Sequence, residues 1–291
     1  MSPWWRTTPY LSSVKKLLSA LLLLFTASLA AQTKVSASDT LSPLQIVQQY
    51  VSPAGFPNKL KFFCCEFYRE WYADSTLGQQ LPARVKRETE LVFQDSAHAA
   101  VHVWLHDSLT SRDVYFFLVK KQNWTLYAAR SLAMTNNAKL EQKRLDSIPQ
   151  EKRGKSYTEK SGHSYAFDYA NLKLWSGTDA ELVAYFNAHK KQFLQLQASL
   201  TKKGFYGKTD SLVEKAMQDK KIRKKADALL IRNFQYNPKY PGAVFYMIGG
   251  MSDNTVGYFY QPDPTKVPHM TEKKFILVRP LGDGWYLFKT T

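Results

Sequence analysis

This chain of 291 residues contains little cysteine: it has two, Cys64 and Cys65, and they are neighbours. Two cysteines in an exported protein would favour a disulfide, but a bridge between adjacent residues requires a strongly distorted peptide. We therefore expect the pair to be two small buried hydrophobic side chains, with an intermolecular bridge as the alternative. A structural zinc site takes four ligands, which argues against a metal site built from this pair alone.

The sequence also lacks an apolar run long enough to cross a membrane. Its longest one, residues 17–30, has about 14 residues and no charge, whereas a spanning helix needs roughly 20. The run follows Arg6, Lys15 and Lys16 and ends in the small residues 28–31, which is typical of a secretory signal peptide. We expect residues 1–31 to be removed, leaving a soluble exported protein, periplasmic or secreted, without a transmembrane segment.

Familiar catalytic signatures are missing as well. We find no pattern for a serine or cysteine nucleophile, a phosphate-binding glycine loop or a dinucleotide fingerprint, and we predict no cofactor. His98, His102 and His106 are four residues apart, a spacing that would align metal ligands on a helix. Alternating valines between them predict a strand instead, where four residues span about 13 Å, so we predict no metal site. His102 and His106 would then line a polar strand face at a domain contact.

What the sequence does have is enough apolar material for packed cores, with 44% hydrophobic and 14% aromatic residues. Without the signal peptide about 260 residues remain, enough for two ordinary domains. We predict a first domain over 41–135, a linker over 136–177 that is rich in Lys, Glu, Ser and Gln, and a C-terminal domain over 178–291.

Two apolar runs around a polar Lys-Lys-Gln-Asn break predict a hairpin over 112–134. Its strands are apolar on both faces, so we expect it at the centre of a sheet. Alternating residues over 85–94 and 101–106 add two more strands, and helical spacing predicts helices over 41–51 and 58–73. The first domain is therefore predicted to be α+β, with helices ahead of a curved antiparallel meander.

This order, with a last strand in which Trp124 is followed by an apolar-Tyr-apolar pattern and then Arg130-Ser131-Leu132, resembles the cone-shaped nuclear-transport-factor-like or SnoaL-like fold. The resemblance covers roughly 41–134 and implies a cone-like domain. It does not imply one activity, because that group includes lyases, isomerases, transport factors and non-catalytic modules.

The C-terminal domain is predicted to repeat the plan of helices followed by an antiparallel sheet. Thr178 to Glu181 forms a capping box that begins a helix, and Gly204 ends it. Alternating runs between 229 and 290 predict strands, with glycines at 282 and 284 in a turn. The ending of the chain resembles that of an uncharacterised class of exported bacterial proteins, which suggests a cell envelope.

Arg130 is the strongest candidate for a ligand-binding residue. It shares a strand face with Trp124 and apolar residues, and an unpaired charge there would be costly. We expect an internal pair with Glu88 or Glu90, or else a pocket for an acidic ligand. The predicted ligand-binding residues are Arg130, Tyr115 and Trp124.

The net charge of +16 is concentrated in the second half, where Lys and Arg exceed Asp and Glu by eight over residues 178–291. The densest run contains Lys220, Lys221, Arg223, Lys224 and Lys225. An exported protein does not normally meet nucleic acid, so this basic surface would meet an anionic glycan or lipid head groups, or serve as a solvated face.

These features favour an exported, non-enzymatic binding or interaction protein of the cell envelope. The competing hypothesis is a small-molecule lyase, isomerase or hydrolase with a pocket around Arg130 and Tyr115. The two differ in whether the first domain encloses a cavity with converging polar groups. The ligand, the partner and the oligomeric state stay open at this level.

The anionic-surface hypothesis predicts salt-sensitive retention of the protein on a heparin-like resin. Changing the five basic residues of 220–225 to Gln removes five positive charges and is expected to move elution to lower salt, because the attraction is electrostatic. Unchanged elution of the variant would contradict the hypothesis.

Overall fold

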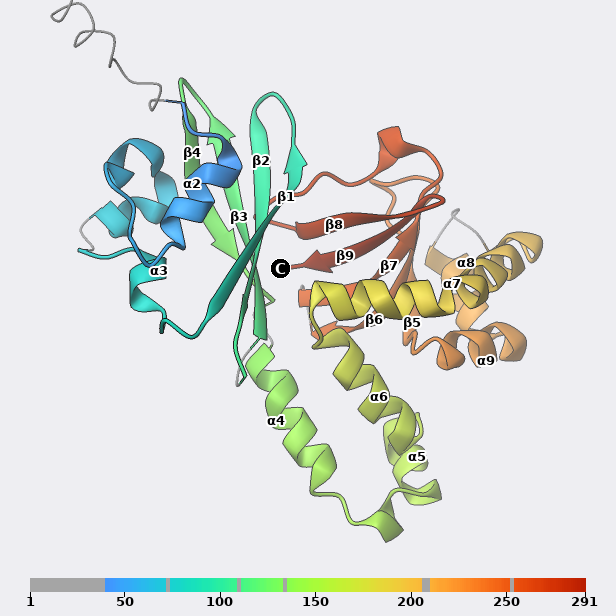
Figure 1. Ribbon diagram of the computed structural model, residues 1–291. Helices are drawn as coiled ribbons and strands as arrows, with labels where there is room; N and C mark the ends of the chain where they lie inside the picture. Colours follow the sequence, from blue (N-terminus) through green and yellow to red (C-terminus); the bar gives the residue numbers. More distant parts are fainter. Residues whose placement is uncertain (1–39, 72–73, 109–110, 133–134, 206–209, 252–253) are drawn as a thin grey trace, which may run out of the picture. The chain divides into compact units, whose positions relative to one another are not determined.

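The protein is described from a computed structural model, which places residues 40–71, 74–108, 111–132, 135–205, 210–251 and 254–291. The predicted signal peptide, residues 1–31, lies outside these ranges. Ser42–Thr291 groups as one compact unit by its contacts. That unit is α+β, as predicted, with a four-stranded and a five-stranded antiparallel sheet (Figure 1).

The first sheet is the predicted meander. Its strands pair in chain order as β1 (Lys86–Gln94), β2 (His98–His106), β3 (Ser111–Lys120) and β4 (Trp124–Arg130). The hairpin predicted over 112–134 corresponds to β3 and β4, but only β3 lies inside the sheet, because β4 is an outer strand. A bridge between Phe63 and Leu126 lies at the edge of β4. That contact explains why an outer strand can be apolar on both faces.

One face of this sheet is covered by α2 (Pro43–Tyr50) and by two 3-10 helices, η1 (Lys59–Phe62) and η2 (Cys65–Trp71). The α-helix predicted over 58–73 is therefore wrong. The chain is extended at Phe63, where the Cys64 amide donates to the Leu126 carbonyl at 3.0 Å, and a short helix α3 (Leu77–Gln80) follows. Aromatic side chains of these segments still pack on the sheet: the rings of Tyr50 on α2 and Phe67 on η2 both contact Phe116 on β3.

The two cysteines are also not placed as expected. Cys64 is half-buried and Cys65 is exposed, so the prediction of two buried hydrophobic side chains is wrong. Both are free thiols. The reason is the same interruption of the predicted helix: Cys65 is the first residue of η2 and has a φ of 61°, so the two cysteines do not continue one helix face toward the core.

Residues 136–177, predicted as a linker, are mostly helical. They contain most of α4 (Thr135–Asp146), then η3 (Gln150–Lys152), α5 (Lys155–Ser161) and α6 (Tyr165–Trp175). The Asn171 amide on α6 donates to the carbonyls of Leu230 and Ile248 at 2.7 and 2.6 Å, which fixes α6 against the second sheet.

The second sheet has the strand order β5-β6-β7-β9-β8. Its strands are β5 (Asn233–Gln235), β6 (Val244–Met251), β7 (Asn254–Tyr260), β8 (Phe275–Gly282) and β9 (Trp285–Thr290), with η4 (Pro264–Lys266) between β7 and β8. The turn between β8 and β9 has positive φ at Gly282 and Gly284, as predicted. Helices α8 (Asp210–Gln218) and α9 (Lys220–Ala228) precede this sheet.

The long helix α7 (Asp179–Lys202) crosses this sheet (Figure 1). It begins with the predicted capping box, in which the Thr178 hydroxyl accepts from the Glu181 amide and the Glu181 carboxylate accepts from the Thr178 amide. Phe186 and Phe193, both fully buried, pack their rings against Tyr258 and Trp285. Among the described residues, no helix is both long and apolar enough to cross a membrane.

Replacing Phe186 with Ala is expected to lower the free energy of unfolding by about 3–5 kcal/mol, because it leaves a cavity among large aromatic rings. Leu194→Ala on the same helix is the control: Leu194 is exposed, and the expected change is within about 0.5 kcal/mol. Guanidinium unfolding measures both. If Phe186→Ala and Leu194→Ala lowered the free energy of unfolding equally, the packing of Phe186 would not stabilise this core.

Candidate functional site

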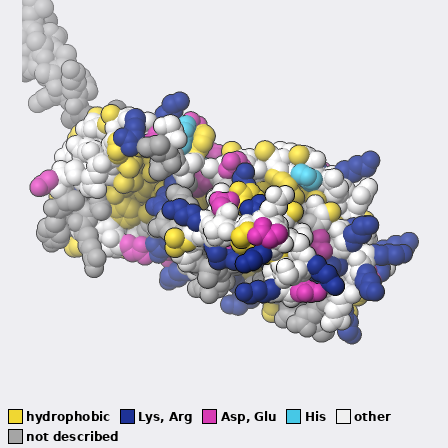
Figure 2. Space-filling view, turned by 90° about the horizontal axis from the view of Figure 1, so that it is seen from below, with side chains coloured by type: hydrophobic (Ala, Val, Ile, Leu, Met, Phe, Trp, Pro, Cys, Tyr) yellow, Lys and Arg dark blue, Asp and Glu magenta, His cyan; other side chains and the backbone are white. Residues whose placement is uncertain are grey.

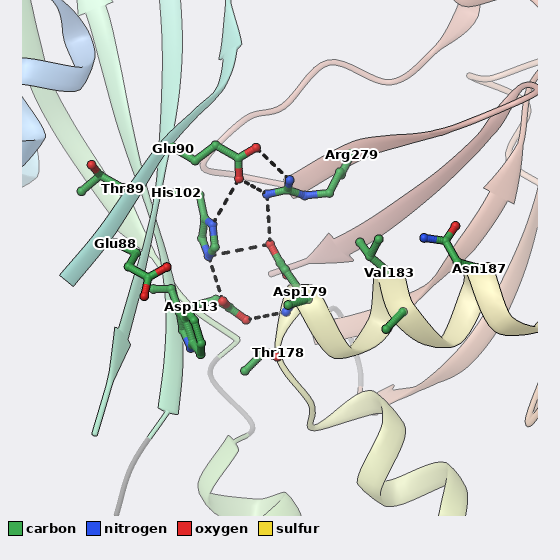
Figure 3. Close-up of a pocket in the computed structure, with 13 residues that line it drawn as sticks. Glu88, Thr89, Glu90, His102, Asp113, Thr178, Asp179, Val183, Asn187 and Arg279 are labelled. Carbon is green, nitrogen blue, oxygen red and sulfur yellow. Dashed lines mark hydrogen bonds and ion pairs between the residues drawn. The ribbon is translucent and has the colours of Figure 1, made fainter. Parts of the chain in front are cut away.

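Six charged or titratable side chains meet where the first sheet faces α7 and the second sheet, and we call them the buried ion cluster. Figure 3 shows all of them except Lys289. The first sheet supplies three of them, α7 one and the second sheet two. They are Glu90 (β1), His102 (β2), Asp113 (β3), Asp179 (α7), Arg279 (β8) and Lys289 (β9).

Strand register explains why the first sheet presents its polar groups together. Glu90 lies opposite His102, and His102 lies opposite Tyr115. Asp113 is two residues before Tyr115, and side chains two apart share a face of a strand. The opposite face of β2 and β3 is apolar and packs on the helices, so the polar groups all turn toward α7.

The first turn of α7 supplies the next contacts. Its capping box fixes Asp179 as the first helical residue, and the free Asp179 amide donates to Asp113 Oδ2 at 3.0 Å. A carboxylate in this position satisfies an otherwise unpaired amide and interacts favourably with the helix dipole. Asp113 therefore joins β3 to the start of α7.

Lys289 occupies the middle of the cluster. Its ammonium group lies 3.1 Å from Asp113 Oδ2 and 2.8 Å from Asp179 Oδ1, and the side chain is only 3% exposed. Burial alone would lower the pKa of Lys289, but the two carboxylates outweigh it and the pKa is raised. The lysine is therefore charged, and its burial depends on the carboxylates that contact it.

The remaining atoms complete the network. His102 Nε2 lies 2.8 Å from Asp113 Oδ1, and the Tyr115 hydroxyl donates to Asp179 Oδ1 at 2.7 Å. Burial and the neighbouring Asp179 raise the pKa of Tyr115 well above its usual value, so the phenol keeps its proton. Asp179 Oδ2 is buried and has no hydrogen-bond donor; His102 Nε2 and an Arg279 nitrogen both lie 3.8 Å from it.

Glu90 and Arg279 form a second link between the sheets. Both terminal nitrogens of the guanidinium donate to the carboxylate, at 2.9 and 2.7 Å. The hydrogen bonds from Arg279 are the main cause of the lowered pKa of Glu90. This bidentate pair leaves Arg279 with its strongest donors already occupied.

A cavity of about 520 Å³ adjoins the cluster, which is within the size range of small-molecule sites. One wall is polar and carries Glu88, Glu90, His102, Asp113 and Arg279. The opposite wall is the first part of α7, where Ala180, Val183 and Ala184 present small or apolar side chains. Asp179 and Asn187 of the same helix also line the cavity, and Asp179 contacts the polar wall.

One donor atom each from His102, Asp113 and Asp179 lies within 4.8 Å of the others, so their spacing would allow a bound metal ion. Their surroundings do not favour one. Lys289 contacts both carboxylates, and Arg279 lies beside Asp179. A divalent cation would have to share these oxygens with two fixed positive charges, so we assign the three residues to the ion network.

The predicted ligand-binding residues are separated in the structure. Tyr115 donates a hydrogen bond to Asp179 of the cluster but is itself fully buried. Arg130 pairs with Glu66 at 2.6 Å through two nitrogens and donates Nε to the Glu272 carbonyl at 2.9 Å. The internal ion pair expected for Arg130 therefore exists, but its expected partners, Glu88 and Glu90, are wrong.

Trp124 is largely buried, with the Lys120 ammonium 5.6 Å from its ring centre, and neither Trp124 nor Arg130 lines the cavity. The predicted basic run lies on α9. Lys220, Lys221, Lys224 and Lys225 are exposed, whereas Arg223 pairs with Asp227 on the same helix. None of the predicted ligand-binding or anionic-surface residues is therefore among the residues that line the cavity.

Sequence reasoning missed Asp113, Asp179, Arg279 and Lys289 as site residues. Asp113 and Lys289 carry a weak signal, since each is a charged residue beside or within an apolar strand. Asp179 was explained by its place in the capping box. Their convergence depends on contacts between residues up to 189 positions apart, which no local pattern encodes.

No protein-family model, curated protein or solved structure matches this chain. The resemblances noted in the sequence therefore stay expectations, and a function has to be argued from the site itself.

The pKa of Asp113 predicts part of the acid sensitivity of the fold. Burial alone would raise this pKa, but Lys289 and His102 outweigh it and lower it from 3.8 to about 2. A pKa lowered on folding stabilises the protein above about pH 4, and this contribution is lost as the pH falls to about 2. It amounts to about 2 kcal/mol.

Guanidinium unfolding of the wild type and of Asp113→Asn across this pH range tests the expectation. The variant should be less stable at neutral pH and should lose about 2 kcal/mol less on acidification. Asp283→Asn, an exposed turn residue, is the control and should follow the wild type. Parallel pH curves for wild type and Asp113→Asn would contradict the assignment.

Proposed function

We propose that this protein binds a small organic molecule in the cavity beside the buried ion cluster. The observation that carries the proposal is the cavity itself, about 520 Å³ with a polar wall on one side and the small and apolar side chains of α7 on the other. Ligand sites typically combine an apolar surface with a few fixed polar groups. More particularly, we propose an exported binding protein of the cell envelope, periplasmic or secreted.

The state of the polar groups supports binding over catalysis. The hydroxyl of Thr178 belongs to the capping box, and that of Thr89 accepts from Gln48 at 3.1 Å. Asp113 and Lys289 hold each other in a fixed geometry. The described lining offers no cysteine or lysine as a nucleophile. Groups held in this way orient a ligand without reorganising, which is an advantage in binding.

A second candidate function rests on one observation, the 2.8 Å contact between His102 Nε2 and Asp113. A histidine oriented by a carboxylate is a common general acid or base. His102 lines the cavity, so a lyase, isomerase or hydrolase would use it rather than the region around Arg130 and Tyr115. Turnover that is lost in His102→Gln while ligand binding survives would favour this candidate.

The basic surface supports a separate partner. Lys and Arg side chains gather toward the end of the molecule that carries α9 (Figure 2), where Lys220, Lys221, Lys224 and Lys225 are exposed. We propose that an anionic glycan or lipid surface of the envelope meets this end. Since none of these residues lines the cavity, the two proposals are independent.

Ligand-observed NMR with a library of small organic fragments tests the cavity. Fragments are expected to bind the wild type and not to bind Val183→Trp, because the indole of the new side chain would fill the space beside α7. Leu194→Trp, on an exposed position of the same helix, is the matched control and should bind like the wild type. Fragment binding that is absent, or unaffected by Val183→Trp, would contradict the proposal.

A further inference from the structure

The charge of the cavity is opposite to that of the protein. Its described lining contains four carboxylates, from Glu88, Glu90, Asp113 and Asp179, and one guanidinium, from Arg279. Lys289 behind the wall adds a second positive charge. Four carboxylates against two cations leave the wall negative, whereas the whole chain carries +16. The acidic surface is therefore a local feature of the cavity.

The positive charges at this wall are already paired with carboxylates. Arg279 donates from both terminal nitrogens to Glu90 and keeps only its Nε, which is buried, without a partner. Lys289 is buried between Asp113 and Asp179. An anionic ligand would have to break one of these pairs and leave a carboxylate unpaired, which is costly in a buried site. The site does not favour acids.

The acceptors of this wall are less fully used. Asp179 Oδ2 is buried and has no hydrogen-bond donor, with His102 and Arg279 nitrogens at 3.8 Å. The Glu88 carboxylate receives one contact, from His106 Nε2 at 2.9 Å, and its side chain is 61% exposed. Trp104 lies in the same lining. Carboxylates beside an indole ring are a favourable environment for an ammonium group.

We infer that the cavity selects an organic cation, a protonated amine or quaternary ammonium group on a small apolar body. The cationic group meets Glu88 and the edge of the buried ion cluster, and the body lies along Ala180, Val183 and Ala184 of α7. The cavity volume and the apolar wall fit an organic molecule better than a bare metal ion. This inference rests on the proposed binding function and specifies its ligand class.

Two matched probe series test it by calorimetry at neutral pH: benzylamine, benzyl alcohol and benzoate, and butylamine, butanol and butyrate. Within a series only the head group changes. The amines are expected to bind about tenfold more tightly than the alcohols, and the carboxylates not measurably, because a charge-assisted hydrogen bond is stronger than a neutral one.

Glu88→Gln should reduce amine affinity about fivefold and leave alcohol affinity unchanged, since it removes a charge from an exposed side chain and keeps its shape. Glu141→Gln on α4, away from the cavity, is the matched control and should change nothing. Asp179→Asn provides a second acidic-wall variant, with its folding verified by circular dichroism.

The outcomes separate this inference from the proposed function. If amines and alcohols bind the wild type equally and both fail to bind Val183→Trp, the cation selectivity is overturned and the binding function is kept. Preference for the carboxylates would also overturn it. Failure of all six probes to bind the wild type would overturn both.

Discussion

The contact on which the rest of this structure depends is the ammonium group of Lys289, held between Asp113 and Asp179 at 3.1 and 2.8 Å. It brings together the last strand of the second sheet, an inner strand of the first sheet and the first residue of α7. Each of these charges would be too costly to bury alone. Together they fix where the two sheets meet, and the cavity forms beside that junction.

Such a cluster fixes the relative position of the two sheets more than it adds to the free energy of unfolding. Replacing a buried ion pair by apolar residues is often neutral or stabilising, whereas removing one partner costs about 3–5 kcal/mol. The cluster therefore penalises arrangements in which the sheets are shifted, because a shift would leave one buried charge without its partner. A fixed polar wall is also what a selective binding site requires.

Much of the fold was predictable from local patterns. Alternation of apolar residues identified β1 and β2, two apolar runs around a polar break identified β3 and β4, and the Thr178 to Glu181 capping box identified the start of α7. The α-helix predicted over 58–73 failed because the backbone at Phe63 and Cys64 bonds instead to Leu126, a tertiary contact. The helices within 136–177 were not predicted, because α4 and α5 expose most of their described residues and so show little apolar periodicity.

The site was less predictable than the fold. Arg130 was correctly expected to need a carboxylate, but the sequence could not show that Glu66 supplies it. Lys289 and Asp113 are far apart in the chain, and each looks like an isolated exception in an apolar strand. Only their convergence with His102 and Asp179 gives them a role, and convergence of that kind is set by how the sheets pack.

A double-mutant cycle between Asp113 and Lys289 tests this account most directly. Guanidinium unfolding at neutral pH would compare the wild type with Asp113→Asn, Lys289→Met and the double variant. We expect each single change to cost about 3 kcal/mol or more. The double variant should cost less than their sum by about 2 kcal/mol, the mark of a direct interaction. Losses that add within about 0.5 kcal/mol would show that the two residues act independently and that the ion cluster does not join the sheets.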